Sequence, residues 1–232
     1  MKNMALVMAA GRGTRFKGSL PKQYVKLAGI EILAHAIQRV ENEPLIDAIV
    51  AVAERKYIKF VMTDIVKKYG FKKVKAVIAG GKERYDSVYN ALKAIRKYSP
   101  ENVVIHDGAR PVFDAQALKA VLASLKTEVA VIPVTRITAT VKQVNNGYVV
   151  QTIDREILRA SVTPQGFKYR ELFSLYSASA IKKIRPTDEA FIFENVGYRV
   201  AVVEHEGFNL KVTTKEDISI LKSYFESMKS KV

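Results

Sequence analysis

Two glycines and a group of cations lie together near the start of the chain, where they could hold a polyanion. Gly11 and Gly13 follow a short apolar run, and glycine lets a backbone approach a phosphate with its N–H groups directed at it. The segment is not a dinucleotide fingerprint, because Phe16 stands where the third glycine belongs, and it is not a P-loop, because no lysine follows Gly18. The neighbouring cations favour a phosphate site over a plain strand-to-helix turn: Arg12, Arg15, Lys17 and Lys22, the last presented by Pro21.

A second glycine pair, Gly80-Gly81, follows another apolar run and precedes Lys82. Adjacent glycines allow a base or a sugar to lie against the backbone. Ser87 closes this segment, and it would either bond a ligand or cap the helix that follows. We therefore predict part of a nucleotide site here and leave the role of Ser87 open.

A carboxylate follows a third apolar run, in the segment His106-Asp107-Gly108-Ala109-Arg110-Pro111. Asp107 suits Mg²⁺, which takes few protein ligands and several phosphate oxygens. We interpret Arg110 as an ion-pair partner that holds the loop, and His106 as structural.

The chain offers no convincing nucleophilic side chain. It has no cysteine, and its three histidines, His35, His106 and His205, form neither a pair with a carboxylate nor a metal site, so we assign none of them a catalytic role. Transfer of a nucleotidyl group to a phosphate needs no such side chain, because the attacking oxygen is already ionised. The protein need only align the reactants and neutralise the developing charge with cations and a metal.

These segments must be positioned by alternating strands and helices. The predicted strands are apolar on both faces, as in a parallel sheet covered on both sides: Ala5–Ala9, Ala48–Ala53, Lys75–Ala79, Asn102–His106, Val129–Val134 and Arg199–Glu204. Helical periodicity lies between them, at Ile32–Val40, Lys56–Lys68, Ser87–Lys97 and Ala115–Lys126. The alternation predicts an α/β fold with a doubly wound, mostly parallel sheet, whose ligands bind beyond the carboxyl ends of the strands.

One stretch departs from this alternation. From Arg136 to Arg155, two alternating segments flank Asn146-Gly147, which is the strongest short-range signal of a β-hairpin. A two-stranded ribbon is marginal alone, so this protruding arm must pack on its own domain or on a second subunit. Because no linker, repeat or low-complexity tract interrupts the chain, we predict a single domain over residues 1–232, with the arm at about 136–155.

The net charge of +15 attracts polyanions, whether nucleic acid, an anionic membrane surface or a polyphosphate substrate. Most lysines lie on predicted helix faces and no basic segment is interleaved with aromatics, so a nucleic-acid-binding domain is the weaker alternative. No apolar run is long enough to span a membrane, and the one near the N-terminus fits a buried strand better than a signal peptide. We expect a cytoplasmic protein with no nucleic-acid or membrane partner.

Several motifs, taken in order, resemble the 2-C-methyl-D-erythritol 4-phosphate cytidylyltransferase family: AAGRGTRF-x₄-PKQY, GGKERYDSV, HDGARP, TPQGF, TDEA and NLKVTT-x-ED. The resemblance extends from about Ala5 to Lys222 and implies a Rossmann-like nucleotidyltransferase fold. It further implies transfer of CMP from CTP to methylerythritol phosphate, with release of pyrophosphate, in non-mevalonate isoprenoid synthesis. The implied cofactor is Mg²⁺ or another divalent cation. Ribitol 5-phosphate cytidylyltransferases share much of this motif set and are the alternative.

The resemblance also assigns residues to roles. Arg15 and Lys22 would stabilise the transition state at the α-phosphate, while Arg155 and Lys211 would position the acceptor phosphate. The implied nucleotide-binding positions are Ala9, Ala10, Gly11, Gly13, Gly81, Lys82 and Ser87. The implied acceptor-side positions are Asp107, also associated with Mg²⁺, and the hydroxyls of Thr140 and Thr163. Because the family is dimeric and its arm enters the partner's active site, Arg155 would act in trans in a homodimer.

Three positions depart from the family pattern. Ala139 precedes Thr140 where Asp is usual, Val162 stands where Gln usually precedes Thr163, and Gly108 replaces a usual Ala. Two of these lie on the acceptor side, so fewer matches support the identity of the polyol phosphate than that of the nucleotide.

Overall fold

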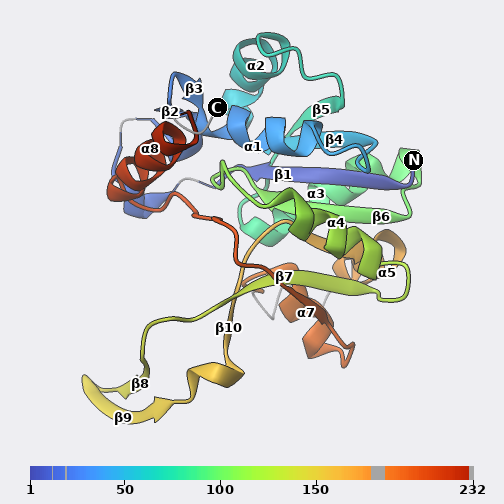
Figure 1. Ribbon diagram of the computed structural model, residues 1–232. Helices are drawn as coiled ribbons and strands as arrows, with labels where there is room; N and C mark the ends of the chain where they lie inside the picture. Colours follow the sequence, from blue (N-terminus) through green and yellow to red (C-terminus); the bar gives the residue numbers. More distant parts are fainter. Residues whose placement is uncertain (12, 19, 179–185, 230–232) are drawn as a thin grey trace.

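A computed structural model describes residues 1–11, 13–18, 20–178 and 186–229, and its centre is a mixed β-sheet (Figure 1). The spatial order of the strands is β10, β7, β11, β6, β1, β4 and β5, and β12 also pairs with β7. Their bounds are β1 Asn3–Ala9, β4 Ala48–Ala53, β5 Val74–Ala79, β6 Asn102–Asp107, β7 Ala130–Arg136, β10 Arg159–Ser161, β11 Gln165–Lys168 and β12 Ala201–Glu204.

The four strands β6, β1, β4 and β5 are parallel neighbours at one end of the sheet, and β12 runs parallel to β7. Strand β11 is antiparallel to both β6 and β7, so those two strands run in the same direction. The predicted doubly wound, mostly parallel sheet is therefore confirmed. Each predicted strand is present, β4 with the predicted bounds and the others with ends that differ by one or two residues.

Strands β10 and β11 were not predicted, because neither is a distinct apolar run. Gly166 shows why β11 fits its place: a Cβ there would lie 2.5 Å from Cγ1 of Val121, so a helix packs directly on the strand backbone. The missing side chain that weakens the sequence signal is what permits this packing.

Helices cover both faces of the sheet (Figure 1). Their bounds are α1 Ile32–Glu41, α2 Ile58–Phe60, which continues as a π-helical segment Val61–Lys67, α3 Arg84–Ile95, α4 Ala115–Ser124, α5 Tyr169–Ser177, α7 Glu189–Asn195 and α8 Glu216–Lys229. Alternate residues of β1 enter opposite cores: Ala5 and Val7 pack with α1 and α4, whereas Met4 and Leu6 pack with α3, α5 and α7. Within the described ranges, no helix is long and apolar enough to cross a lipid bilayer.

Helix α8 packs at the side of the molecule against the short strands β2 Lys26–Leu27 and β3 Ile30–Glu31. A third apolar cluster lies here, with Phe16 from the first glycine segment and Val212 and Leu221 from the C-terminal part of the chain. This cluster brings the segment before α8 back to the loop that follows β1.

The predicted hairpin is also confirmed. Strands β8 Val141–Asn145 and β9 Tyr148–Ile153 pair antiparallel, and Asn146 and Gly147 both have positive φ, as the turn between them requires. The arm extends away from the body of the protein (Figure 1).

Candidate active site

The two glycine segments meet at the carboxyl edge of the parallel strands. Strand β1 ends at Ala9 and β5 ends at Ala79, and the backbones that follow approach each other closely. A Cβ on Gly80 would lie 2.4 Å from the Cβ of Ala10, and one on Gly81 would lie 2.2 Å from the Cβ of Asp86. A larger residue at Gly80 would therefore push the two loops apart, and one at Gly81 would clash with the first turn of the helix Arg84–Ile95.

Ser87 holds the second glycine segment in place. Its Oγ accepts a hydrogen bond from the Gly81 N–H at 2.9 Å and lies 3.1 Å from the Glu83 carbonyl, to which it donates. Of the two roles left open for Ser87, the helix cap is excluded, because α3 begins at Arg84 and a capping box of Glu83 and Asp86 forms its N-terminus. Lys82 is exposed beside this loop.

The first glycine segment is fixed by a residue that the sequence reasoning did not single out. Gln23 is buried, and its Nε2 donates to the carbonyl oxygens of Ala9 at 2.6 Å and Gly11 at 3.0 Å. The only signal for it was its place in the PKQY motif. Gly13 has φ of 60°, and the stem of Lys22 packs against it, since a Cβ there would lie 3.2 Å from Lys22 Cδ. Arg12, one of the cations expected here, lies outside the described residues.

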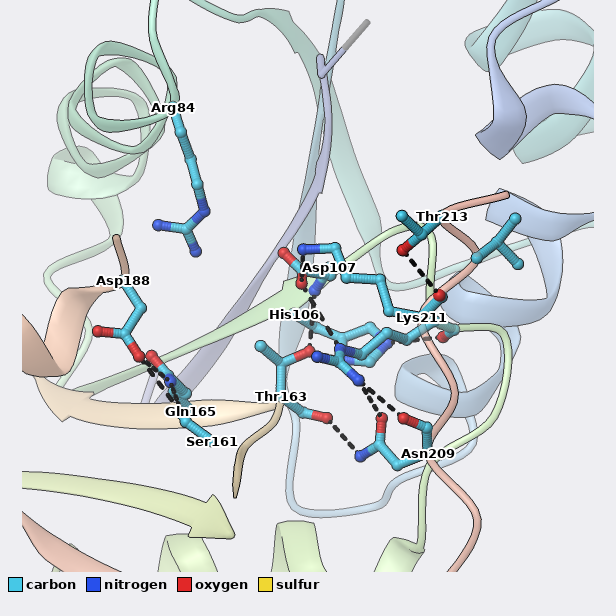
Figure 2. Close-up of polar contacts among 12 residues, drawn as sticks. Arg84, His106, Asp107, Ser161, Thr163, Gln165, Asp188, Asn209, Lys211 and Thr213 are labelled. Carbon is cyan, nitrogen blue, oxygen red and sulfur yellow. Dashed lines mark hydrogen bonds and ion pairs between the residues drawn. The ribbon is translucent and has the colours of Figure 1, made fainter. Parts of the chain in front are cut away.

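Asp107, at the end of β6, is the acidic centre of the site (Figure 2). Its Oδ2 lies 2.7 Å from Lys211 Nζ and 3.5 Å from Arg110 Nε. Burial alone would raise the pKa of this carboxyl, but Lys211, Arg84 and Arg110 together hold it well below its usual range. Asp107 is therefore ionised at any physiological pH.

Lys22 reaches the same region from the first loop. Its Nζ donates to the carbonyl oxygen of Val212, in the segment that carries Lys211. Burial and then the positive charge of Lys211 lower the pKa of Lys22 to about 8, with a smaller contribution from Arg15. The sequence placed these cations in two distant segments, and the fold brings them within electrostatic range of one another.

Asn209 ties the Asp107 loop to the segment that carries Lys211. Nη1 of Arg110 donates to the Asn209 carbonyl at 2.7 Å, and Asn209 Nδ2 donates to the Thr163 carbonyl at 2.9 Å. The interpretation of Arg110 as an ion-pair partner that holds this loop is confirmed by its contacts with Asp107 and Asn209. As with Gln23, the only sequence signal for Asn209 was its place in a motif, NLKVTT-x-ED.

A buried ion pair supports the site from the other side. Nη1 and Nη2 of Arg84 lie 2.6 and 2.9 Å from the two carboxylate oxygens of Glu189, which is fully buried and also accepts from Tyr176. The residue just before Glu189, Asp188, caps α7 and accepts a hydrogen bond from Gln165 Nε2 at 2.9 Å. The TDEA motif thus supplies a helix cap and a structural carboxylate, neither of which was predicted.

Gly108, one of the departures from the family pattern, lies in a tight place. A Cβ there would meet Cδ1 of Leu33 at 2.8 Å and the Met8 carbonyl oxygen at 3.1 Å. The glycine therefore lets Leu33 pack close to the end of β1, next to Asp107.

Two of the predicted site residues lie apart from this cluster. Arg155 and Thr140 belong to the arm, and both are exposed. Arg155 donates to the Thr138 carbonyl and lies 3.7 Å from Glu156, so the contacts it makes within the described chain are local. One chain by itself therefore assembles Lys22, Asp107, Lys211 and Thr163 but leaves the arm's cation outside.

Comparison with known proteins identifies the family of this chain. The model of the 2-C-methyl-D-erythritol 4-phosphate cytidylyltransferase family matches residues 3–227. The curated enzyme of that name from Clostridium acetobutylicum is 38% identical over 93% of this chain and 94% of its own, and that from Geotalea uraniireducens is 36% identical over 99% of both. The crystal structure of 4-diphosphocytidyl-2C-methyl-D-erythritol synthase from Anaerococcus prevotii matches with a TM-score of 0.85 and 28% identity, over 97% of this chain and 96% of that one. The chain therefore belongs to the 2-C-methyl-D-erythritol 4-phosphate cytidylyltransferase family.

Proposed function

We propose that this chain transfers the CMP group of CTP to 2-C-methyl-D-erythritol 4-phosphate, giving CDP-methylerythritol and pyrophosphate. Membership of the family supports the reaction. The observation that carries it in the structure is the group of cations around one ionised carboxylate, next to two glycine loops at the carboxyl edge of the sheet. Two phosphate-bearing substrates can approach each other only where such cations offset their repulsion.

In this reaction a phosphate oxygen of the acceptor attacks the α-phosphorus of CTP. The bond from that phosphorus to the oxygen bridging to the β-phosphate breaks, and pyrophosphate leaves with the electron pair. Lys22 and Arg15, on the glycine-loop side, offset the charge that develops at the α-phosphate and leaving group. We assign Lys211, which donates to Asp107, to the phosphate of the acceptor. No side chain needs to accept a proton, because the attacking oxygen is already ionised.

A divalent cation fits this site only as a companion of the triphosphate. Among the described residues, no group of three His, Cys, Asp or Glu side chains could hold a metal ion. Asp107 contacts Lys211 and Arg110 through Oδ2, which leaves Oδ1 for a metal. Mg²⁺ often takes one carboxylate oxygen together with phosphate oxygens. We propose that Asp107 contributes this ligand; when bound, the metal would neutralise charge on the phosphates.

The function is tested by measuring pyrophosphate release with CTP and a panel of polyol phosphates. Turnover is expected with 2-C-methyl-D-erythritol 4-phosphate and is expected to require a divalent cation. A clear preference for ribitol 5-phosphate would instead support the alternative acceptor.

Lys22→Ala should abolish turnover while leaving the fold intact, because it removes a cation from the α-phosphate region. The matched control is Lys26→Ala, which removes an exposed lysine from β2. Circular dichroism and thermal unfolding would show whether each variant is folded. An unchanged rate for Lys22→Ala would contradict the assigned role.

We further propose that two copies form a homodimer in which the arm of one completes the site of the other. The arm carries Arg155 and Thr140 and also exposes large apolar side chains, with Tyr148 79% and Val149 61% exposed. A ribbon with such a surface gains stability by packing on a partner.

Mixing two inactive variants tests this arrangement. If Arg155 acts in trans, a dimer of one Lys22→Ala and one Arg155→Ala subunit keeps one intact site, and random exchange restores about a quarter of wild-type activity. Each variant alone should stay inactive with the acceptor. No recovery, although native mass spectrometry shows mixed dimers, would place Arg155 in its own subunit's site. We also propose that the protein acts in the cytoplasm, because CTP is a cytoplasmic metabolite.

A further inference from the structure

His106 is a fully buried histidine with both ring nitrogens bonded, next to the acidic centre of the site (Figure 2). Its Nε2 lies 3.0 Å from the carbonyl oxygen of Arg110. A carbonyl oxygen can only accept a hydrogen bond, so Nε2 must carry a proton. The ring is fully buried and both of its hydrogen-bond partners, a carbonyl and a hydroxyl, are uncharged, so the neutral form of the imidazole is favoured over a buried charge. A neutral imidazole has one proton, so Nδ1 is an acceptor.

The orientation of the Thr163 hydroxyl follows from this tautomer. Thr163 Oγ1 lies 3.0 Å from His106 Nδ1, and it must donate its single proton there because Nδ1 has none. The same oxygen accepts from the backbone N–H of Asp107 at 3.1 Å. A hydroxyl has one proton and two lone pairs, so Thr163 has one lone pair left and nothing left to donate.

We propose that His106 is a positioning residue that holds Thr163 as a hydrogen-bond acceptor, so that Thr163 recognises a hydroxyl group of the polyol and not its phosphate. This inference rests on the proposed function. A phosphate oxygen at neutral pH is also an acceptor, and two acceptors cannot bond each other. Binding of the acceptor phosphate is then left to cations, and Thr163 helps to set which way round the polyol lies.

The same ring also steadies the carboxylate. By bonding the Arg110 carbonyl, His106 pins the turn in which the Arg110 N–H bonds the Asp107 carbonyl at 2.9 Å. A single neutral imidazole thus fixes Asp107, Arg110 and Thr163 relative to one another, without touching the substrate.

The tautomer can be tested on the wild-type protein. With ¹⁵N-labelled histidine, the ring of His106 should show a protonated Nε2 and a bare Nδ1 at neutral pH. The chain has only two other histidines, and His106→Gln assigns the signal. A ring protonated at Nδ1, or on both nitrogens at neutral pH, would overturn the proposal whether or not the variants fold.

Two variants of His106 test its role in specificity, and each variant keeps the function of one ring nitrogen. Asn places an oxygen near the position of Nδ1 and so keeps an acceptor for Thr163, whereas Gln places an amide near Nε2 and keeps only the bond to Arg110. Thr163→Val should raise the acceptor KM by up to about tenfold, the value of one hydrogen bond, and leave the CTP KM unchanged. His106→Gln should act in the same direction, and His106→Asn should stay closer to the wild type.

The double variant decides whether the two residues act together. Because His106 acts through Thr163, His106→Gln/Thr163→Val should have the same acceptor KM as Thr163→Val alone. His35→Gln is the matched control, since His35 is a buried histidine whose one hydrogen bond within the described residues is to the Leu27 carbonyl, and neither KM should change. If the two substitutions multiplied each other's effect on the acceptor KM, or if the CTP KM rose equally, the proposal would be overturned. If the wild type releases no pyrophosphate with any polyol phosphate, the proposed function fails while the tautomer experiment still stands.

Discussion

Lys22 enters the site from a loop and lies near two other cations, so its ionisation depends on its neighbours. Burial and the charge of Lys211 disfavour its protonated form, while Asp107 and Asp217 partly offset them. The resulting pKa of about 8 means that the free enzyme holds this proton weakly. An anionic substrate binds best when the proton is present, so substrate binding and protonation of Lys22 favour each other.

This coupling predicts an alkaline limit to activity. As pH rises through about 8, Lys22 of the free enzyme loses its charge, and kcat/KM for CTP should fall. The measurement is a pH profile from about pH 6 to about pH 10, at constant ionic strength. In Lys22→Arg the fall should disappear from this range, because a guanidinium stays charged, even if the rate itself is lower. A wild-type profile that is flat above pH 8 would show that the charge of Lys22 is not needed for CTP capture.

Single residues could be predicted from the sequence when few structural roles would explain that residue type at that position. Asp107 and Lys22 stand out because a carboxylate or a lysine after a glycine-rich or apolar run has few structural explanations. Gln23 and Asn209 could not be found in this way. Their importance comes from the backbone carbonyls they reach, and those partners are defined only once the loops are folded.

Helices α3 and α7 are joined at their first residues by the Arg84–Glu189 pair. Both helices pack on the same face of the sheet, and the pair lies beside the site, where the charge of Arg84 acts on Asp107. Glu189 is fully buried, and its carboxylate accepts hydrogen bonds from Arg84 and Tyr176. The pair therefore sets how the second glycine segment, just before α3, lies against the rest of the site.

Removing one partner should cost more than removing both. Arg84→Met leaves a buried carboxylate without its cation, and we expect a loss of about 3–5 kcal/mol in the free energy of unfolding. The double variant Arg84→Met/Glu189→Met should lose much less, because no charge is left unpaired. Urea unfolding monitored by circular dichroism measures both. Lys168→Met, which removes one partner of the exposed Lys168–Glu101 pair, is the control and should change little. Equal losses in the single and double Arg84 variants would contradict a buried-charge origin.

At the level of elements, the pattern of apolar residues predicted the bounds well where the whole segment lies in one environment. Strand β4, apolar on both faces and wholly buried, has the predicted bounds. Strand β11 is the contrasting case. It is short and contains a glycine, and its place between β6 and β7 depends on residues far away in the sequence. The arm was predictable because the Asn-Gly turn is a local signal, whereas what the arm packs against is not local.

The whole molecule carries a net charge of +15, and many of its lysines lie away from the site on helix surfaces. Such a field raises the rate at which anionic substrates arrive and is weakened by salt. The alternative function for this charge is nucleic-acid binding, which predicts tight and steeply salt-dependent binding to oligonucleotides.

Salt should therefore lower kcat/KM for CTP by several-fold between about 50 mM and about 500 mM, with little change in kcat. Reversing two exposed charges remote from the catalytic cluster, in Lys59→Glu/Lys67→Glu, should weaken this dependence without changing kcat. Stopped-flow or initial-rate kinetics at matched pH measure it. Binding of duplex and single-stranded oligonucleotides is measured in parallel. Strong binding of oligonucleotides, with no effect of salt on kcat/KM for CTP, would favour the nucleic-acid alternative.

The sequence by itself determined the chemistry of this protein: the absence of a nucleophile, the glycines and cations of a phosphate site, one carboxylate, and the alternation that puts them at one edge of a parallel sheet. Those features are local, because they depend on residue type and short spacing. The single-domain prediction rests on the same kind of reading and stays a prediction.

Only the tertiary structure decided how these groups act on one another. Lys22 and Lys211 lie 189 positions apart in the chain, yet Lys211 lowers the pKa of Lys22 and helps to keep Asp107 ionised in the same site. The tautomer of His106, and with it the direction of the Thr163 hydroxyl, depends on a carbonyl oxygen presented by a folded turn. Hydrogen bonds and electrostatic fields depend on distances in space, and only the packed sheet and its loops set those distances.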